Sequence, residues 1–332
     1  MKYKTLVFVA ACLTFIVVVV GAYVRLQDAG LGCPDWPGCY GHLVGVPEGA
    51  DQIARAEQGF PDRPVEGHKA WKEMFHRYIA GTLGLLLVTI MVIAWRKRRV
   101  LQQSPWLPTA IVLLVGVQAT LGKWTVTMLL KPVIVTLHLL GGMATLALIS
   151  WLALRQREWP AMSPGALRLR SWAAIGLVIV ICQIALGGWV STNYAALICR
   201  DFPTCHGAWL PAMDFDHGFH LARELGMTAA GAPLSIEALT AIHWTHRIGA
   251  LLTLIYIGSF ALELIRTGGC ARMGAALAML LALQLCLGLA NVLMTLPLPI
   301  AVAHNAVAAA LLVTMVVINF ALSRGGTRPN SV

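Results

Sequence analysis

Charged residues are scarce in this chain. Asp, Glu, Lys and Arg make up only 12% of its 332 residues, about half of their share in an ordinary soluble domain. Hydrophobic residues make up 58% of the chain, and the mean hydropathy is +0.72. A soluble domain of this size could not bury so much apolar surface. The composition therefore excludes a soluble enzyme, a disordered protein and a coiled coil, and it leaves a polytopic α-helical membrane protein.

Eight hydrophobic runs are long enough to cross a membrane, which takes about 20 apolar residues. The first run ends in Tyr23-Val24-Arg25 without a small-residue cleavage site, so we expect a retained helix rather than a cleaved signal. The fold class is therefore an all-α polytopic membrane protein with eight transmembrane helices. The predicted spans are Thr5–Val24, Tyr78–Trp95, Trp106–Val126, Val133–Leu154, Ser171–Ser191, Ala241–Leu262, Arg272–Met294 and Ile300–Leu322.

Acidic residues are nearly absent from one set of span ends. That side has 14 of the 25 basic residues with only Glu158 and Glu263 nearby, whereas the other side has 13 of the 15 acidic residues. By the positive-inside rule, we expect both termini in the cytoplasm and the long loops 26–72 and 192–240 outside. Because the net charge of +10 follows from this topology, we expect no nucleic-acid partner. The 14 basic residues are Lys2, Lys4, Arg96, Lys97, Arg98, Arg99, Arg155, Arg157, Arg168, Arg170, Arg266, Arg272, Arg324 and Arg328.

The chain contains an internal repeat. Matching residues at a common offset of 166 are Cys33 with Cys199, Cys39 with Cys205, Gln118 with Gln284, Gly122 with Gly288, and His138 with His304. The dipeptide His76-Arg77 matches His246-Arg247 at an offset of 170. A shared offset across several spans indicates duplication. Each half has four spans, so both halves enter the membrane in the same direction and the repeat is parallel. We predict two four-helix bundles, formed by residues 1–160 and 161–332.

Four histidines occupy equivalent places in the two halves: His76, His138, His246 and His304. Two histidines on facing helices can hold the iron of a flat macrocycle from both sides, and neutral imidazole is a standard haem ligand. We predict a bis-histidine haem in each bundle, with His76 and His246 at the starts of their helices. The alternatives are histidines paired to solvent or backbone, and a bare transition-metal site. We expect five others to be surface residues: His42, His68, His206, His217 and His220.

One difference separates the halves near these histidines. Glu73 aligns with His243, and each residue lies one helical turn before its histidine ligand. We predict that Glu73 is an acid/base group pointing toward the haem cavity, although a helix N-terminal carboxylate is the simpler interpretation. The difference predicts one haem at a substrate or catalytic site and one that carries electrons. The residues considered for contacts with haem propionates or the pocket are Arg77, Arg247, Arg25 and His243.

The eight cysteines fall into two groups. Cys33–Cys39 and Cys199–Cys205 lie in the outer loops, where an oxidising compartment permits disulfides. We favour two disulfides, with a four-cysteine zinc site or a redox-active Cys33–Cys39 pair as alternatives. The other four are expected to be small buried hydrophobic residues: Cys12, Cys182, Cys270 and Cys286.

Several motifs together resemble the haem A synthase family of bacterial plasma membranes and mitochondrial inner membranes. They are the eight repeated spans, the run Gly30-Leu31-Gly32-Cys33-Pro34-Asp35-Trp36-Pro37-Gly38-Cys39, Glu73-x-x-His76-Arg77, His138, His243-x-x-His246-Arg247 and His304. The resemblance implies oxidation of the haem O C8 methyl group to a formyl group by two successive hydroxylations with loss of water. It also implies a haem b cofactor on His246 and His304, and a haem O site on His76 and His138 that needs Glu73.

The resemblance also implies partners and a location. We expect a multi-pass protein of the bacterial plasma membrane that contacts membrane lipid, takes haem O, and works with a haem O synthase and an unidentified electron donor. A diheme b-type electron carrier is the alternative function, and Glu73 in one half alone argues against it. A transporter is a third hypothesis, and the scarcity of charged residues in the spans argues against that.

Overall fold

The computed structural model describes residues 2–160 and 162–323 of the chain. Throughout these residues every regular element is a helix, and eight helices are long and apolar enough to cross a membrane. Their bounds are α1 Tyr3–Leu26, α3 Gly67–Arg96, α5 Trp106–Thr127, α6 Pro132–Leu154, α8 Arg170–Thr192, α10 Ile236–Arg266, α11 Ala271–Leu293 and α12 Leu298–Ser323. The predicted all-α membrane fold with eight spans is confirmed. Arg324 and Arg328, which contributed to the predicted orientation, lie outside the described residues.

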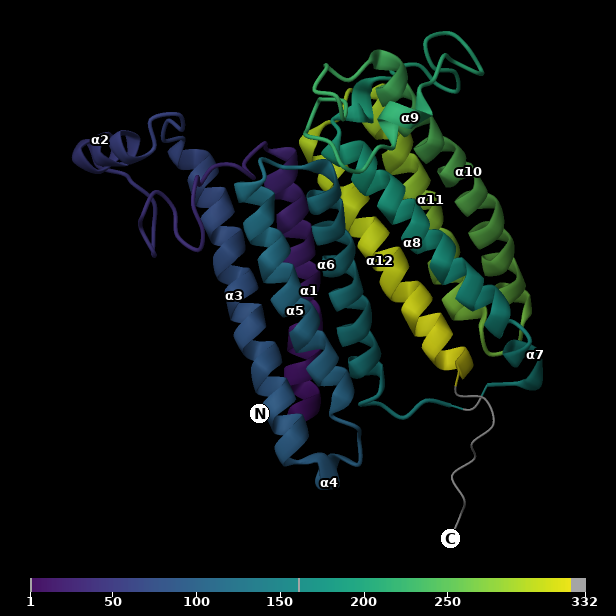
Figure 1. Cartoon of the computed structure of the whole chain (residues 1–332). Coiled ribbons are helices and arrows are strands. Elements are labelled where there is room, and N and C mark those ends of the chain that lie inside the picture. The colour runs from purple at the N-terminus through teal and green to yellow at the C-terminus, as the bar shows by residue number, and fades with distance from the viewer. Residues whose placement is uncertain (1, 161, 324–332) are drawn as a thin grey trace.

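Short helices mark the connections at the two ends of the molecule. The long connections contain α2 (Ala50–Gly59), η1 (Ala195–Leu197) and α9 (Phe215–Gly218), whereas α4 (Arg98–Leu101) and α7 (Pro164–Leu167) lie in the short connections. Figure 1 shows α2 and α9 at the upper end of the long helices and α4 and α7 at the lower end. The two large loops therefore share one end of the molecule, as the topology prediction requires.

Helices α3 and α10 begin earlier than the apolar runs predict. The predicted spans begin at Tyr78 and Ala241, but the helices begin at Gly67 and Ile236. In α10 the hydroxyl of the N-cap Ser235 accepts a hydrogen bond from the Ala238 N–H at 3.1 Å, which satisfies a free donor of the first turn. The placement of His76 and His246 at helix starts was therefore wrong. Both lie more than two turns inside their helices, because the residues before each predicted span continue the helix.

The eight long helices pack in the same order in each half of the chain. In the first half α1 contacts α3 and α6, and α5 also contacts α3 and α6. In the second half α8 contacts α10 and α12, and α11 also contacts α10 and α12. Helices α1 and α6 contact α12, and α6 contacts α8, between the halves. These contacts agree with two four-helix bundles (Figure 1), while the duplication and the division at residue 160 stay predictions.

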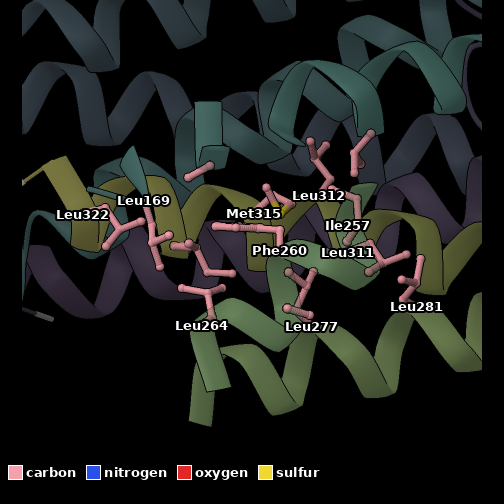
Figure 2. Close-up of a cluster of buried hydrophobic side chains, with 14 of the residues drawn as sticks. Leu169, Ile257, Phe260, Leu264, Leu277, Leu281, Leu311, Leu312, Met315 and Leu322 are labelled. Atoms are coloured by element: carbon pink, nitrogen blue, oxygen red, sulfur yellow. The ribbon is translucent and has the colours of Figure 1, made fainter. Parts of the chain in front are cut away.

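The largest cluster of buried hydrophobic side chains lies mainly in the second half and includes Met143 and Leu146 of α6. Part of it is drawn in Figure 2. Phe260 of α10, Leu277 of α11 and Met315 of α12 meet there with almost no exposed surface. Glycine lets α8 approach this cluster, since a Cβ atom at Gly176 would lie 2.8 Å from the Met315 methyl carbon. Small residues at helix contacts are typical of membrane bundles, in which close packing replaces the hydrophobic driving force.

The cysteines in the spans differ from the expectation. Cys270 is buried as predicted, but Cys12, Cys182 and Cys286 are exposed on the protein surface. The prediction of burial was wrong for these three. A small apolar side chain gains little from leaving a lipid environment, because hydrocarbon tails are as apolar as a protein core.

The two halves meet at the ends of α1 and α8 through positions that are 166 residues apart. The Arg25 Nη2 donates to the Ser191 carbonyl at 2.7 Å, and the Tyr194 hydroxyl donates to the Asp28 Oδ1 at 2.7 Å. The Arg25 guanidinium also lies 4.1 Å from the centroid of the Tyr194 ring. Arg25, which was considered for propionate binding, therefore joins the two halves in this structure.

Candidate functional site

Each of the four predicted ligand histidines lies against a glycine of a neighbouring helix. The pairs are His76 with Gly21, His138 with Gly122, His246 with Gly187, and His304 with Gly288. A Cβ atom at these glycines would lie 3.0 to 3.4 Å from the imidazole Cε1 atom, which is closer than the optimal carbon–carbon separation of about 3.5–4.0 Å. The glycines therefore provide the space that the four imidazole rings occupy.

The histidines of each half lie on opposite helices of their bundle. Helices α3 and α6, which contain His76 and His138, are each packed against α1 and α5. Helices α10 and α12, which contain His246 and His304, are each packed against α8 and α11. Within each half the two histidines are close enough to interact electrostatically. Two imidazoles facing each other across a bundle core are an arrangement that can hold a metal macrocycle between them.

The donor set fits a haem better than a bare metal ion. Nδ1 of His76, His138 and His304 is buried without a hydrogen-bond partner, whereas the Gln284 Nε2 lies 3.2 Å from the His304 Nε2. In the described part of the chain, the compact group of potential metal ligands is Cys199, Cys205 and His206, and both of its cysteines are in a disulfide. The predicted histidine pairs therefore have the donor chemistry and the glycine-lined space that bis-histidine haem ligation requires.

Glu73 and Arg77 join α3 to the first cysteine loop. The Glu73 carboxylate is only 5% exposed, pairs with the Arg77 guanidinium, and accepts a hydrogen bond from the Cys33 N–H at 2.9 Å. Arg77 also donates to the carbonyls of Asp35, Pro37 and Gly38. Glu73 thus has protein partners on the loop side, and the loop takes the donors of Arg77 that were considered for a propionate.

His243 and Arg247 do the same in the second half. The Arg247 Nε donates to the His243 Nε2 at 3.3 Å, and its two Nη atoms donate to the carbonyls of Cys199, Asp201 and Thr204 at 2.7 to 3.0 Å. Every nitrogen of the Arg247 guanidinium therefore has a partner within the protein. The structure gives Arg77 and Arg247 the role of holding the cysteine loops against α3 and α10.

Both cysteine loops close as predicted. Cys33 is bonded to Cys39 and Cys199 to Cys205, and all four residues are completely buried. The two disulfides are confirmed, and a four-cysteine zinc site is excluded because its thiolates are not available. Whether Cys33–Cys39 is redox-active stays a prediction.

An aspartate organises the turn of each loop. Asp35 accepts hydrogen bonds from the N–H groups of Tyr40 and Gly41, and Asp201 accepts them from His206 and Gly207 at 2.9 Å each. The Thr204 hydroxyl donates to the Asp201 carboxylate at 2.6 Å. This hydroxyl and the backbone N–H groups hold the pKa of the Asp201 carboxyl well below its usual range, because they stabilise its ionised form.

Two polar residues of the second half were missed in the sequence. The Gln183 side chain lies against the His246 ring, with Nε2 at 3.1 Å from the histidine Nδ1. Arg223 is 2% exposed, yet its Nε and Nη1 atoms have no partner, while its Nη2 donates to the Asn193 Oδ1 at 2.5 Å. Gln183 has Val17 at its repeat position, so the repeat comparison could have pointed to it. Arg223 lies in a long loop without a periodic signal.

The five remaining histidines behave mostly as expected. His68, His206, His217 and His220 are exposed, and His42 is half-buried. His206 contacts the Thr240 hydroxyl at 3.2 Å, and His217 pairs with Asp214.

The fold and the sites define a class of protein: a multi-pass helical membrane protein with a histidine pair across the core of each bundle. A family model described as cytochrome oxidase assembly protein, COX15-CtaA, matches residues 4–316. The chain belongs to this family.

Curated relatives extend over almost the same length. The chain is 42% identical to the heme A synthase of Shewanella oneidensis over 330 residues, which cover 97% of both chains. It is 27% identical to the heme A synthase of Methylobacterium radiotolerans, over 97% of this chain and 90% of that protein. It is also 27% identical to the heme A synthase of Caulobacter vibrioides, over 92% of this chain and 91% of that protein.

Proposed function

We propose that the protein is a membrane oxidoreductase that converts haem O to haem A. The C8 methyl group of haem O is oxidised to a formyl group through two hydroxylations and the loss of water. The observation that supports this function is the pair of similar but unequal histidine sites in a chain whose full-length relatives are named heme A synthase. A pure electron carrier would have no need for a buried carboxylate beside one site only.

The two sites have different occupants in this proposal. Residues 1–160 form the substrate domain, in which His76 and His138 bind haem O. Residues 161–332 form the cofactor domain, in which His246 and His304 bind haem b. Haem b, when bound, supplies one-electron transfer. The matched imidazole–glycine contacts support two macrocycle sites of similar shape, and the presence of Glu73 in one half supports the assignment of the substrate to that half.

Glu73 is proposed as the group that accepts or delivers a proton at the substrate site. Its carboxylate lies one helical turn before His76 and is almost completely buried. The Arg77 guanidinium and the Cys33 N–H fix the position of this carboxylate. The same contacts hold the first cysteine loop over the end of α3, so Glu73 links the loop to the substrate site.

Arg223 is proposed to bind a propionate of the haem in the second half. A buried guanidinium with two unpaired nitrogens is costly, and an anionic partner removes much of that cost. Arg223 is suited to this role because its Nε and Nη1 atoms are free, whereas all nitrogens of Arg247 have partners. Its guanidinium lies 5.7 Å from the Trp189 ring. Trp189 is two residues after Gly187, the glycine against which His246 packs.

The proposed setting is the bacterial plasma membrane, with both termini in the cytoplasm and the cysteine loops outside. Membrane lipid surrounds the eight helices. A haem O synthase supplies the substrate, and an unidentified electron donor delivers electrons to the C-terminal haem.

Extraction of haem from cells tests the proposed function. The chain is produced together with a source of haem O, and the extracted haems are separated by chromatography. We expect a formyl haem in cells that contain the wild-type chain and none in cells without it. Unchanged haem O beside a normal b-type spectrum would instead identify an electron carrier.

A further inference from the structure

The two histidine sites differ in the hydrogen-bond partner of one imidazole, that of His76 on α3 or His246 on α10. In the second half the Nδ1 atom of His246 has a partner, because the Gln183 Nε2 lies 3.1 Å from it. In the first half Nδ1 of His76 is buried without a partner. The residue at the Gln183 position of the first half, 166 residues earlier, is Val17, whose side chain has no polar atom. The same ring position is thus supported in one half and unsupported in the other.

The Gln183 amide is held in a confined place. Its Nε2 atom also donates to the His246 backbone carbonyl at 3.1 Å. The amide also packs directly against Gly249 of α10, where a Cβ atom would collide with the Gln183 Oε1. That Oε1 atom is buried and has no hydrogen-bond partner. A buried amide oxygen without a donor costs free energy, so the amide as it stands is only half satisfied.

Iron ligation by His246 would call for the opposite orientation of the Gln183 amide. A neutral histidine that binds iron through Nε2 has its proton on Nδ1, so Nδ1 becomes a donor and needs an acceptor. A half-turn of the Gln183 amide brings Oε1 to the place of Nε2 and provides that acceptor, in exchange for the Nε2 hydrogen bond to the His246 carbonyl. No proton is gained or lost, because the imidazole proton moves from Nε2 to Nδ1. Hydrogen-bonded partners of this kind fix the orientation of a ligand histidine and make it a stronger ligand.

We propose that Gln183 is the positioning residue that makes the C-terminal site the one with a resident haem. This inference rests on the proposed ligation of haem by His246. The N-terminal site, with Val17 and an unsupported His76, binds its haem more weakly through that ligand. Weaker ligation suits a site whose haem must enter as substrate and leave as product, whereas a cofactor has to stay.

Two substitutions at Gln183 test the role of the amide. Gln183→Val copies the first half, and we expect haem b affinity to fall about 10- to 100-fold, the usual effect of losing such a partner. Gln183→Glu keeps the shape and gives Nδ1 a stronger acceptor. Because a stronger acceptor stabilises ferric haem, we expect the reduction potential of the C-terminal haem to fall in Gln183→Glu and to rise in Gln183→Val. A role in packing alone would not shift the potential in opposite directions.

The matched control is Gln118→Val, which removes a partly buried glutamine from the other bundle. Gln118 lies against Gly141 as Gln183 lies against Gly249, so the change in volume is the same. We expect the affinity and potential of haem b to stay at the wild-type values. The measurements are haem content per protein and a spectroscopic redox titration of the purified full-length chain.

Failure of the inference is distinguishable from failure of the proposed function. Haem lost in His246→Ala, with unchanged affinity and potential in both Gln183 variants, would overturn the role of Gln183 and leave the ligand assignment intact. Haem b retained at its wild-type affinity and spectrum in His246→Ala would overturn the ligand assignment itself.

Discussion

Replacement of Glu73 by glutamine separates catalysis from loop anchoring. The carboxylate has two partners, the Arg77 guanidinium and the Cys33 N–H. A hydrogen bond that involves a charged group contributes about 1.5–3 kcal/mol and a neutral one about 0.5–1.5 kcal/mol. Loss of the charge at both contacts therefore weakens loop anchoring by about 2 kcal/mol. A general acid or base contributes about 10²- to 10⁴-fold in rate, which is about 3–5 kcal/mol of barrier.

The second half provides a matched control at the equivalent position. His243 contacts Arg247, which holds the second cysteine loop as Arg77 holds the first. His243→Gln therefore places the same side chain at the equivalent position in a half without a carboxylate. We expect both variants to lower the midpoint of thermal unfolding, and only Glu73→Gln to lower haem A formation at least 100-fold, a typical acid/base effect of about 10² or more. Equal loss of haem A in both variants, or wild-type formation in Glu73→Gln, would refute the catalytic role.

Three further predictions concern the outer loops. Arg223→Leu should lower haem b affinity about 10- to 100-fold, since a charge-assisted bond of about 1.5–3 kcal/mol is lost, and an unchanged haem content at limiting haem would contradict the propionate role. The pKa of the Asp201 carboxyl is lowered, first by the Thr204 hydroxyl and then by backbone N–H groups. The ionised carboxylate therefore stabilises the folded protein fully above the pKa of an unfolded aspartate, about 3.9, and this stabilisation is lost as the pH falls below that value. The thermal stability gap between wild type and Asp201→Asn should therefore shrink in acid, and a constant gap would contradict this. The double substitution Cys199→Ser and Cys205→Ser should cost about 2 kcal/mol of unfolding free energy, measured by denaturant titration, and wild-type stability would show that the bridge contributes nothing.

The sequence predicted the membrane architecture because hydrophobic length is a local property. Eight apolar runs became eight helices, but polar residues such as His68 and Lys69 continue α3 beyond the run, and no apolar pattern marks that extension. The histidine pairs and disulfides could be predicted because they recur at a fixed offset in the two halves. Each of these signals can be read along the chain without knowledge of the packing.

The partners of the arginines could not be predicted in the same way. Arg77 and Arg247 were expected to face haem propionates, but the loop carbonyls that occupy them lie about 40 residues or more away in the chain. Every residue has a backbone carbonyl group, so the sequence contains no signal that marks the ones that an arginine contacts. Arg223 and Gln183 were missed for a related reason, because their importance depends on burial and on unpaired atoms that only the packed structure defines.

The assignment of the two histidine pairs is tested most directly by the absorbance of purified single-histidine variants. The account predicts that the low-spin b-type spectrum is lost or becomes high-spin in His246→Ala and in His304→Ala, and that it persists in His76→Ala and in His138→Ala. The spectrum depends on paired axial imidazoles, so it reports the ligands without any need for turnover. An unchanged spectrum in both C-terminal variants would contradict the account of a resident haem in that half.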